Sequence, residues 1–380
     1  MAFMEAPSED QRDGKLDMSS LIDIIAGARP NFMKVAPIIH AMRSRSEDGG
    51  RLRWRLVHTG QHYDARMSDA FFEQLRIPAP DVHLGVGSGT HAQQTAAIMT
   101  AYEGLLMQER ADACLVVGDV NSTMACAIAA QKLHVPVAHV EGGLRSHDWS
   151  MPEEINRRVT DSITNWFFTT SRHANDNLWR EGVEQERIFL VGNTMIDTLL
   201  ANLPHLRPPP FAGGLEKGKY IVLTLHRPAN VDDEGRLRAQ LEAVADHAQG
   251  LDVVFPVHPR THSRLQGIRE LPENLLLVEP QPYLEFIWLV KHALGVVTDS
   301  GGITEETTVL GVPCMTLRDN TERPETVETG TNELLGTDPT AIPPAMERLL
   351  AGRWKKGAIP DKWDGKAARR IVGILEDLLA

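Results

Sequence analysis

The sequence predicts an α/β protein with two Rossmann-like domains whose parallel sheets face each other across a cleft. Short runs rich in β-branched residues alternate with segments of helical periodicity along most of the chain, as is typical of βαβ units. A segment rich in Pro and Gly, residues 202–219, interrupts this alternation and has the composition of a linker. A second series of strands and helices follows it. We therefore expect a cleft between the carboxyl ends of the two sheets.

The order of the predicted elements sets the expected domain boundaries. Residues 1–18 lack the apolar core of a signal peptide and are predicted to be a disordered tail. The first domain is expected over 19–203 and the second over 204–365, with a terminal amphipathic helix within 366–380. Strands are predicted at 21–26, 54–59, 135–140, 166–169, 188–191, 220–225, 252–256, 275–278, 295–298 and 313–317, and in the run that ends at Asp119. Helices are predicted at 65–75, 90–108 and 122–133.

Composition excludes several classes of function. The chain has 380 residues and a net charge of −12, which argues against a general nucleic-acid binder because such proteins present a basic surface. No apolar run approaches the roughly 20 residues of a membrane span, so we expect a cytoplasmic protein. The three cysteines stand among apolar neighbours and are predicted to be reduced core thiols.

The stretch HVEGGLRSHDWSMPEEINRR, residues 139–158, is the strongest candidate for a catalytic site. A short strand leads into Glu141, and a helix that begins at Pro152 presents Glu153 and Arg157. Asp119 ends a neighbouring strand, so three carboxylates are expected at one sheet edge, an arrangement suited to proton transfer. The alternatives are that Asp119 only caps a helix and that Glu153 and Arg157 form a surface ion pair.

Periodicity also predicts which way this helix faces. Ile155, Val159 and Ile163 recur every four residues and are expected to form its buried stripe. Glu153, Arg157 and Asp161 would then lie on the opposite face, toward solvent or the cleft.

Three other segments have the features of an anion or nucleotide site. Arg29 lies in a strand-to-helix turn and Lys34 on the helix that follows, where backbone amides and cations can bind phosphate; two surface side chains are the alternative. In TDSGGITEE, Ser300, Gly301 and Gly302 open a helix and Glu306 could accept ribose hydroxyls, against the alternative of a plain glycine turn. His226 follows a strand end, and its neighbours favour a phosphate or proton-transfer role over a structural one. A charged loop, residues 318–323, is expected near the same cleft.

Metal and redox cofactors are not expected. The pairs His58/His62 and His258/His262 have i,i+4 spacing, but they lie in predicted strand ends or loops and lack a third ligand. The glycines of LGVGSGTH do not have the spacing of a dinucleotide fingerprint, and no P-loop is present. We therefore predict that no metal, NAD or other cofactor is bound.

The motifs together resemble those of a known family. GARPNFMKVAP, TGQHYD, VVGDVNST, HVEGGLRS, MPEEINRR, VGNTMID, FPVHPR, TDSGGITEE and RDNTERPE occur in this order from about residue 22 to the terminal helix. The chain resembles the non-hydrolysing UDP-N-acetylglucosamine 2-epimerases. The resemblance implies a GT-B-like fold in which the C-terminal helix crosses back to pack on the first domain. It also implies a homodimer that supplies ManNAc units for surface polysaccharides.

The resemblance further implies a reaction and roles for individual residues. UDP-GlcNAc and UDP-ManNAc would be interconverted by anti elimination of UDP to 2-acetamidoglucal, followed by re-addition with inversion at C2. By position, four residues match the family's catalytic groups: Asp119, Glu141, Glu153 and His226. The residues that match or flank its substrate-binding motifs are Arg29, Lys34, Arg145, Arg157, Ser300, Gly301, Gly302, Glu306 and Arg323.

The chain departs from the family pattern at a few places. Asn31 stands where many members have a glutamate, HRPAN replaces a commoner HRREN-like sequence, and Gln61, His62 and Tyr63 vary from the loop that binds an activating second UDP-GlcNAc in some members. The alternatives are a 2-epimerase of a related UDP-2,3-diacetamido sugar, a hydrolysing epimerase, a GT-B glycosyltransferase and a catalytically silent nucleotide-sugar sensor.

Overall fold

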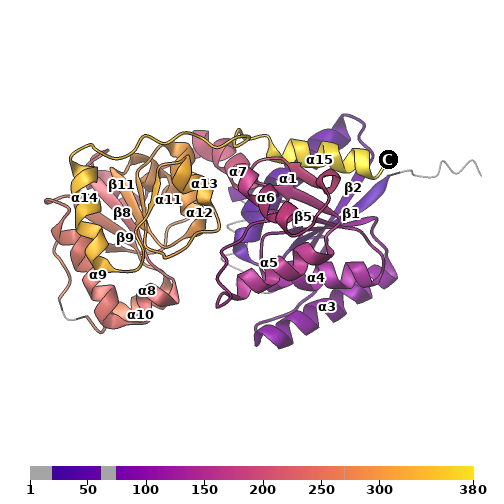
Figure 1. Ribbon diagram of the computed structural model, residues 1–380, viewed down its shortest axis with the longest axis horizontal. Coiled ribbons are helices and arrows are strands. Elements are labelled where there is room, and N and C mark those ends of the chain that lie inside the picture. Colours follow the sequence, from indigo (N-terminus) through magenta and orange to yellow (C-terminus); the bar gives the residue numbers. More distant parts are fainter. Residues whose placement is uncertain (1–18, 61–73, 269) are drawn as a thin grey trace, which may run out of the picture.

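The chain folds into two parallel β-sheets, each flanked by helices (Figure 1). The computed structural model describes residues 19–60, 74–268 and 270–380. The predicted tail at 1–18 and most of the predicted helix at 65–75 lie outside these residues. The two sheets confirm the predicted fold class.

The first sheet has seven strands in the order β3-β2-β1-β4-β5-β6-β7, and every neighbouring pair is parallel. Its strands are β1 (Ser20–Ala26), β2 (Leu52–His58), β3 (Val82–His83), β4 (Ala113–Val117), β5 (Val137–Val140), β6 (Trp166–Thr169) and β7 (Ile188–Leu190). The helices of this half are α1 (Arg29–Glu47), α3 (His91–Gln108), α4 (Asn121–Lys132), α5 (Pro152–Ile163), α6 (Arg172–Arg180) and α7 (Thr194–Asn202).

The second sheet has six parallel strands in the order β10-β9-β8-β11-β12-β13. Its strands are β8 (Tyr220–Thr224), β9 (Asp252–Pro256), β10 (Leu275–Val278), β11 (Gly295–Thr298), β12 (Cys314–Thr316) and β13 (Asn332–Leu334). The helices are α8 (Pro228–Val231), α9 (Glu234–Asp246), α10 (Pro259–Leu265), α11 (Tyr283–His292), α12 (Gly301–Leu310), α13 (Pro324–Glu328) and α14 (Ile342–Leu350), and α15 (Ala367–Leu378) follows.

Most strand predictions are confirmed to within about two residues, but β3 and β13 were missed. These two edge strands have only two and three residues, too few for a recognisable periodic pattern. The predicted linker contains two 3₁₀ turns, Leu203–His205 and Pro210–Gly214.

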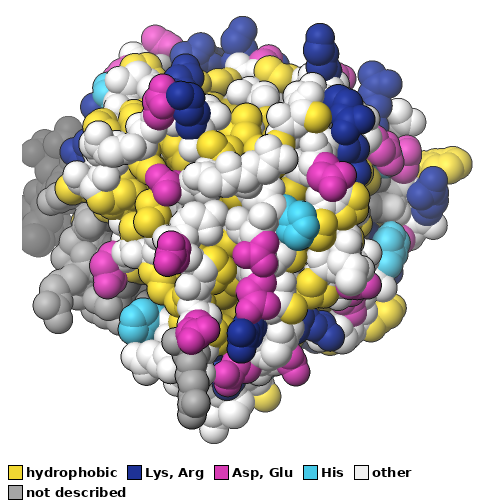
Figure 2. Space-filling view, turned by 90° about the vertical axis from the view of Figure 1, so that its left-hand side faces the viewer, with side chains coloured by type: hydrophobic (Ala, Val, Ile, Leu, Met, Phe, Trp, Pro, Cys, Tyr) yellow, Lys and Arg dark blue, Asp and Glu magenta, His cyan; other side chains and the backbone are white. Residues whose placement is uncertain are grey.

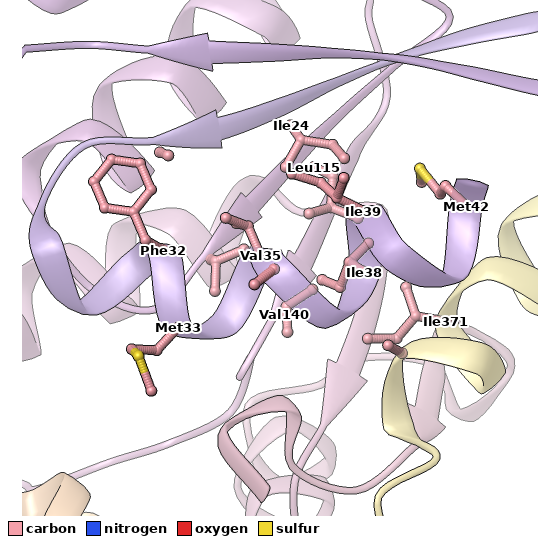
Figure 3. Packing of buried hydrophobic residues seen from close by; sticks show 14 of the residues in the cluster. Ile24, Phe32, Met33, Val35, Ile38, Ile39, Met42, Leu115, Val140 and Ile371 are labelled. Atoms are coloured by element: carbon pink, nitrogen blue, oxygen red, sulfur yellow. The ribbon is translucent and has the colours of Figure 1, made fainter. Parts of the chain in front are cut away.

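Helix α1 packs directly on the first sheet (Figure 3). Phe32 and Ile39 of this helix belong to the same buried cluster as Ile24 of β1 and Leu115 of β4. Their packing fixes the start of α1 at the carboxyl end of β1. The turn that carries Arg29 and the helix that carries Lys34 are thereby positioned at the edge of the sheet.

The chain returns from the second half to the first at its C-terminal end. After α14 it crosses over both halves, and α15 packs beside α1 and α7 (Figure 1). Ile371 of α15 joins the buried cluster of the first sheet. The carboxylate of Asp197 on α7 accepts hydrogen bonds from the backbone N–H groups of Ala367 and Ala368, at 3.1 and 2.7 Å. It thereby satisfies two of the free amides at the start of α15.

The surface and the cysteines agree with the composition. Figure 2 shows acidic and basic side chains interspersed with apolar ones on the face at the end of the second half. Within the described residues no helix is long and apolar enough to cross a membrane.

Cys114, Cys126 and Cys314 are free thiols and buried, which confirms the prediction of reduced core cysteines.

Candidate active site

Asp119 and Glu141 lie at the same edge of the first sheet, because β4 and β5 are parallel neighbours that end next to each other. The chain turns sharply at both ends, with φ of +70° at Gly118 and +71° at Glu141. A side chain at position 118 would place its Cβ 3.2 Å from Lys34 Nζ. A positive φ at a residue other than glycine is strained, and such residues are found more often at functional sites. The backbone conformation of Glu141 therefore supports a functional role for this residue.

Glu141 forms a buried ion pair with Lys34 of α1. Lys34 Nζ lies 2.5 Å from Glu141 Oε2, and both residues are buried. Arg323, which comes from the second half, places its guanidinium 3.8 Å from the same carboxylate oxygen. The other oxygen, Oε1, is buried and accepts no hydrogen bond from the part of the chain that the structure describes. Since such an oxygen is costly to leave unpaired, it is a candidate contact for a ligand.

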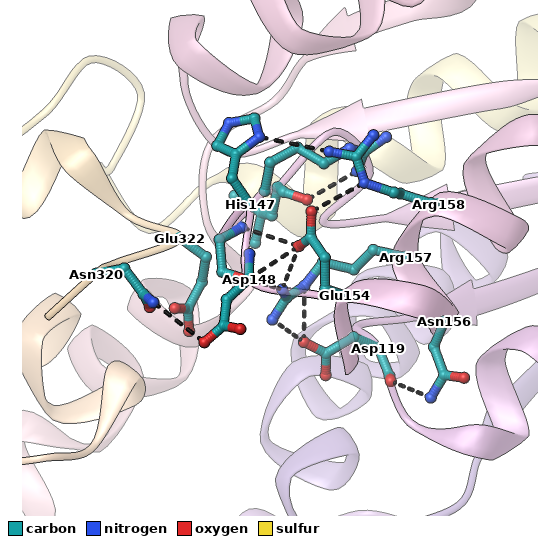
Figure 4. Close-up of polar contacts among 12 residues, drawn as sticks. Asp119, His147, Asp148, Glu154, Asn156, Arg157, Arg158, Asn320 and Glu322 are labelled. Atoms are coloured by element: carbon teal, nitrogen blue, oxygen red, sulfur yellow. Dashed lines mark hydrogen bonds and ion pairs between the residues drawn. The ribbon is translucent and has the colours of Figure 1, made fainter. Parts of the chain in front are cut away.

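Asp119 is held by Arg157 of α5 (Figure 4). Arg157 Nη2 and Nε donate to Asp119 Oδ2 at 2.6 and 3.0 Å, and Arg157 Nη1 donates to Glu154 Oε2 at 3.0 Å. Burial acts to raise the pKa of Asp119, but the charges of Arg157, Lys34 and Arg323 outweigh it and hold the pKa below its ordinary value. The side chain is nevertheless 28% exposed, so Asp119 is an ionised carboxylate that a ligand can reach.

The predicted orientation of α5 is wrong. Ile155 is 44% exposed and Val159 is only half-buried, and of the predicted stripe Ile163 alone packs against a buried cluster, so the stripe as a whole does not face the core. The helix lies against the polar ends of β4 and β5, where buried charges need partners, and its inner face is polar for that reason. Glu153 is half-buried. The buried residues of α5 are Glu154, Asn156, Arg157, Thr160 and Asp161.

Arg145 lies in a buried network behind this edge. Its Nη1 is 2.6 Å from Asp161 Oδ2, and its Nε and Nη2 donate to Glu181 of the loop after α6 at 2.9 and 2.6 Å. Asp161 also contacts His139 Nδ1 at 2.6 Å. The guanidinium of Arg145 therefore ties the loop after β5 to α5 and to residues beyond α6.

The second half contributes a buried cluster of charges from the loop after β12. Arg323 Nη1 donates to Glu322 at 2.5 Å, Arg323 Nε donates to Glu305 of α12, and Arg318 Nη2 donates to Glu322 at 2.7 Å. Burial acts to raise the pKa of Glu322, but the charges of Arg323 and Arg318 outweigh it and hold the pKa well below its ordinary value. For Glu305, in contrast, burial is the larger effect, and the pKa is raised above its ordinary value.

The two halves meet through side chains at this cluster. Besides the approach of Arg323 to Glu141, Asn320 donates to Asp148 Oδ2 at 3.3 Å (Figure 4). Asp148 belongs to the loop that joins β5 to α5. The charged loop of the second half therefore lies against the loop that begins with Glu141.

The start of α12 lies beside the same cluster. Ser300, Gly301 and Gly302 form the turn and first residues of this helix. A Cβ at position 301 would lie 2.8 Å from Glu322 Oε1, so only glycine fits there without displacing the Glu322 side chain. Glu306, one turn further, is buried next to Tyr283, and burial raises its pKa to about 8.

His226 and Asp299 connect the ends of β8 and β11. His226 Nδ1 lies 2.8 Å from Asp299 Oδ1. The backbone N–H groups of His226 and Arg227 also donate to Asp299 Oδ2, at 3.0 and 2.9 Å. Burial acts to raise the pKa of Asp299, but these donors hold it below its ordinary value. The imidazole of His226 is 44% exposed and oriented by a fixed acceptor.

The turn after β1 is shaped by Asn31, which sequence reasoning treated only as a departure. Asn31 Oδ1 accepts the N–H groups of Gly27 and Ala28 at 3.1 and 3.0 Å, and its Nδ2 donates to Val117 O at 3.0 Å. An ionised glutamate could accept these bonds but could not donate the third. Arg29 begins α1, and its side chain lies outside what the structure describes.

Other residues of the site were missed because sequence spacing does not show which member of a pair faces inward. Each glutamate pair, Glu153–Glu154 and Glu305–Glu306, includes one member that binds a site arginine. The charged loop was identified as a whole, but the separate roles of Arg318 and Glu322 were not.

From the sequence, neither of the two histidine pairs, His58/His62 and His258/His262, is predicted to bind a metal. His62 lies outside the described residues. In the described parts of the chain, no group of three or more His, Cys, Asp or Glu side chains is arranged to hold a metal ion.

The chain matches the family model for UDP-N-acetylglucosamine 2-epimerase over residues 45–376. It is 42% identical over 368 residues to a Methanocaldococcus jannaschii UDP-N-acetylglucosamine 2-epimerase, covering 93% of this chain and 98% of that protein. It is also 42% identical over 315 residues to a Pseudomonas aeruginosa UDP-2,3-diacetamido-2,3-dideoxy-D-glucuronate 2-epimerase, covering 82% of this chain and 87% of that one.

Solved structures show the same architecture. The Methanocaldococcus jannaschii UDP-GlcNAc 2-epimerase in complex with UDP-GlcNAc and UDP superposes with a TM-score of 0.83 at 41% identity, over 93% of this chain and 99% of that chain. Medicago truncatula UGT71G1 complexed with UDP-glucose superposes with a TM-score of 0.59 at 11% identity, over 96% of this chain and 99% of that chain. The second likeness concerns the fold alone, and it identifies the two-sheet arrangement as GT-B-like.

Proposed function

Because this chain belongs to the UDP-N-acetylglucosamine 2-epimerase family, we propose that it interconverts UDP-GlcNAc and UDP-ManNAc without net hydrolysis. In the elimination step, a base takes the C2 proton, the C1=C2 bond forms, and the C1–O bond breaks with its electron pair going to UDP. The bound 2-acetamidoglucal then takes UDP back at C1 and a proton on the opposite face of C2. The step needs proton-transfer groups beside the sugar and cations that hold UDP.

The proton-transfer groups in this proposal are Asp119, Glu141, Glu153 and His226. The lowered pKa of Asp119 keeps it ionised, which supports a role in charge stabilisation and leaves it free to accept a proton. Glu141 has a strained backbone and one unpaired oxygen among the described residues. His226, oriented by Asp299, would act from the second half.

The groups that hold UDP in this proposal come mainly from the second half. Ser300, Gly301 and Gly302 present the amides of the start of α12, where an anion is favoured. Glu306, whose raised pKa leaves it protonated near neutral pH, would bind ribose hydroxyls as donor as well as acceptor. The cations assigned to substrate are Arg29, Lys34, Arg157 and Arg323, and Arg145, whose side chain is paired in the buried network, would support them from behind.

The observation that carries the proposal is the convergence of Lys34 and Arg323 on Glu141. A carboxylate from one sheet edge meets a cation of its own half at 2.5 Å and one from the other half at 3.8 Å. A nucleotide sugar bound between the halves would therefore have its sugar near carboxylates and its phosphates near cations and a helix N-terminus.

The test follows the hydrogen at C2. The protein is incubated with UDP-GlcNAc in deuterated water, and proton NMR should show loss of the C2 proton signal and appearance of UDP-ManNAc. Phosphorus NMR should show no accumulation of free UDP. The absence of both C2 exchange and a ManNAc signal would refute the epimerase assignment for this substrate.

The same experiment separates the alternatives. A parallel sample with a UDP-2,3-diacetamido uronic acid tests the second candidate substrate, which the Pseudomonas aeruginosa relative favours. Accumulating UDP would indicate a hydrolysing epimerase. Transfer to an acceptor with the C2 hydrogen retained would indicate a glycosyltransferase, and binding without turnover a sensor.

The proposal includes a cellular setting and an assembly. The enzyme would work in the cytoplasm as a homodimer, without a metal or redox cofactor, and supply ManNAc units for surface polysaccharides. The domain boundaries at 203/204 and 365/366 stay predictions. Light scattering in solution tests the dimer, and a monomer at assay concentration would refute it.

A further inference from the structure

His139 on β5 bridges two parts of the candidate site. It is fully buried. Its Nδ1 lies 2.6 Å from Asp161 Oδ1 on α5, and its Nε2 lies 2.8 Å from the backbone oxygen of Gly118 at the end of β4. The ring thus joins the helix that carries Arg157 to the turn that carries Asp119.

Both partners of the ring are acceptors. The Gly118 carbonyl oxygen cannot donate. Asp161 accepts from Arg145 Nη1 at 2.6 Å and from the N–H of Gly143 at 3.0 Å. Burial acts to raise the pKa of Asp161, but His139 and Arg145 hold it below its ordinary value, so this carboxylate is ionised. A neutral imidazole has one N–H and would place a lone pair against one of the two acceptors.

We propose that His139 is an imidazolium that donates from both ring nitrogens and thereby positions Asp119 and Glu141 for the reaction. Both ring nitrogens donate, one to Asp161 and one to Gly118. The charged side chains that the structure places around the ring are Asp161, which contacts it, and Arg145, which contacts Asp161. This inference rests on the proposed function for its catalytic consequence, but the protonation state does not depend on it.

The route to Asp119 is a single peptide bond. The carbonyl of Gly118 and the N–H of Asp119 belong to one planar unit, so the bond from Nε2 sets the orientation from which the Asp119 backbone starts. The N–H of Gly118 donates to Val140 O at 3.0 Å, which fixes the other side of the turn.

The route to Glu141 is the chain itself, since His139 precedes it by two residues. The chain then passes over the ring at Gly142, where an added Cβ would lie 3.4 Å from His139 Nδ1, 3.4 Å from Asp161 Oδ1 and 2.9 Å from Phe167. The close approach holds the Glu141 turn against the ring.

The protonation state is tested by NMR on protein labelled with ¹⁵N at histidine. We expect the spectrum at neutral pH to show one histidine with both ring nitrogens in the protonated range. This signal should vanish in His139→Asn or His139→Gln. If neither variant folds, the wild-type spectrum still decides: absence of any such imidazolium overturns the inference.

The positioning role is tested with the same two variants. The amide of Gln can reach Gly118 and that of Asn can reach Asp161, so each keeps one of the two donors. We expect both to lower kcat for C2 exchange by at least about tenfold, with UDP affinity within about threefold of wild type. We expect Gln to retain more activity, because it keeps the bond to the Asp119 peptide. His247→Gln, at the C-cap of α9 in the other half, is the matched control and should keep wild-type kcat.

The outcomes separate the two proposals. Unchanged kcat in both variants, with only a lowered Tm, would reduce His139 to a structural residue and overturn its positioning role while the epimerase assignment stands. A wild-type protein that shows no C2 exchange would refute the epimerase assignment, and the ring nitrogens would still report the protonation state.

Discussion

Arg323 Nη2 lies 3.8 Å from Glu141 Oε2 although the two residues belong to different halves of the chain. Arg323 is also the hub of its own half, with ion pairs to Glu305 and Glu322. The guanidinium of Arg323 therefore neutralises buried carboxylates of the second half. It also approaches Glu141 of the first half, the residue whose backbone has a positive φ. Changes at this residue should affect chemistry and the fit between the halves together.

Arg323→Lys is expected to lower kcat for epimerisation by at least about tenfold. Lysine keeps the charge but lacks the planar fork that serves Glu305, Glu322 and Glu141 at once. Steady-state kinetics on UDP-GlcNAc provide the measurement. Arg353→Lys, at an exposed position, is the control and should match wild type. Equal rates for both variants would contradict the role of the fork.

Asp119→Asn and Glu141→Gln are expected to lower kcat by about 10²–10⁴-fold, the usual range for removing a proton-transfer group. Both amides are nearly isosteric with the carboxylates they replace, so UDP binding should survive and can be measured by calorimetry. Asp176→Asn, an exposed position, is the control. A near-normal rate in either variant would remove that residue from the proton-transfer set.

Ile371→Ala is expected to destabilise the protein by about 2–4 kcal/mol, or roughly 5–10 °C in Tm for a unit of this size. Ile371 joins α15 to the buried cluster under α1, so the deletion leaves a cavity where the returning helix meets the first half. Ile359→Ala, at a side chain that is 54% exposed, should shift Tm by less than about 1 °C. Calorimetric scans of both variants provide the comparison, and equal shifts would contradict this role for α15.

Much of the fold was predictable because parallel strands buried on both faces are short apolar runs. The runs that became β4, β5 and β11 stand out in the sequence for this reason. The edge strands β3 and β13 were not predictable, since two or three residues have no period. The strand ends were also informative, because Asp119 and Glu141 follow apolar runs directly and therefore had to lie at one sheet edge.

The orientation of α5 was not predictable from periodicity. Ile155, Val159 and Ile163 have helical spacing, but buried ion pairs decided which face turned inward: Arg157 pairs with Asp119 and Glu154. Counting apolar residues assumes that the protein interior next to a helix is apolar. At a sheet edge made of charged strand ends that assumption fails, so the same spacing that identifies a core helix elsewhere was misleading here.

Glu306→Gln is expected to change how stability depends on pH. Burial raises the pKa of Glu306 to about 8 in the folded protein, against about 4.3 for an unperturbed glutamate. The folded state therefore binds this proton more tightly than the unfolded chain. The resulting stability is fully present below about pH 4.3, falls as pH rises, and is lost once pH passes about 8. Glutamine is always neutral and lacks this dependence.

The Tm of wild type minus that of Glu306→Gln should accordingly fall between pH 5 and 8 and level off above pH 8. Carboxylates with lowered pKa, such as Asp299, cancel in the difference. Calorimetric scans at both pH values measure it, with Glu279→Gln, an exposed position, as the control whose difference should stay constant. A constant difference for Glu306→Gln would mean that this carboxyl group is already ionised in the folded protein.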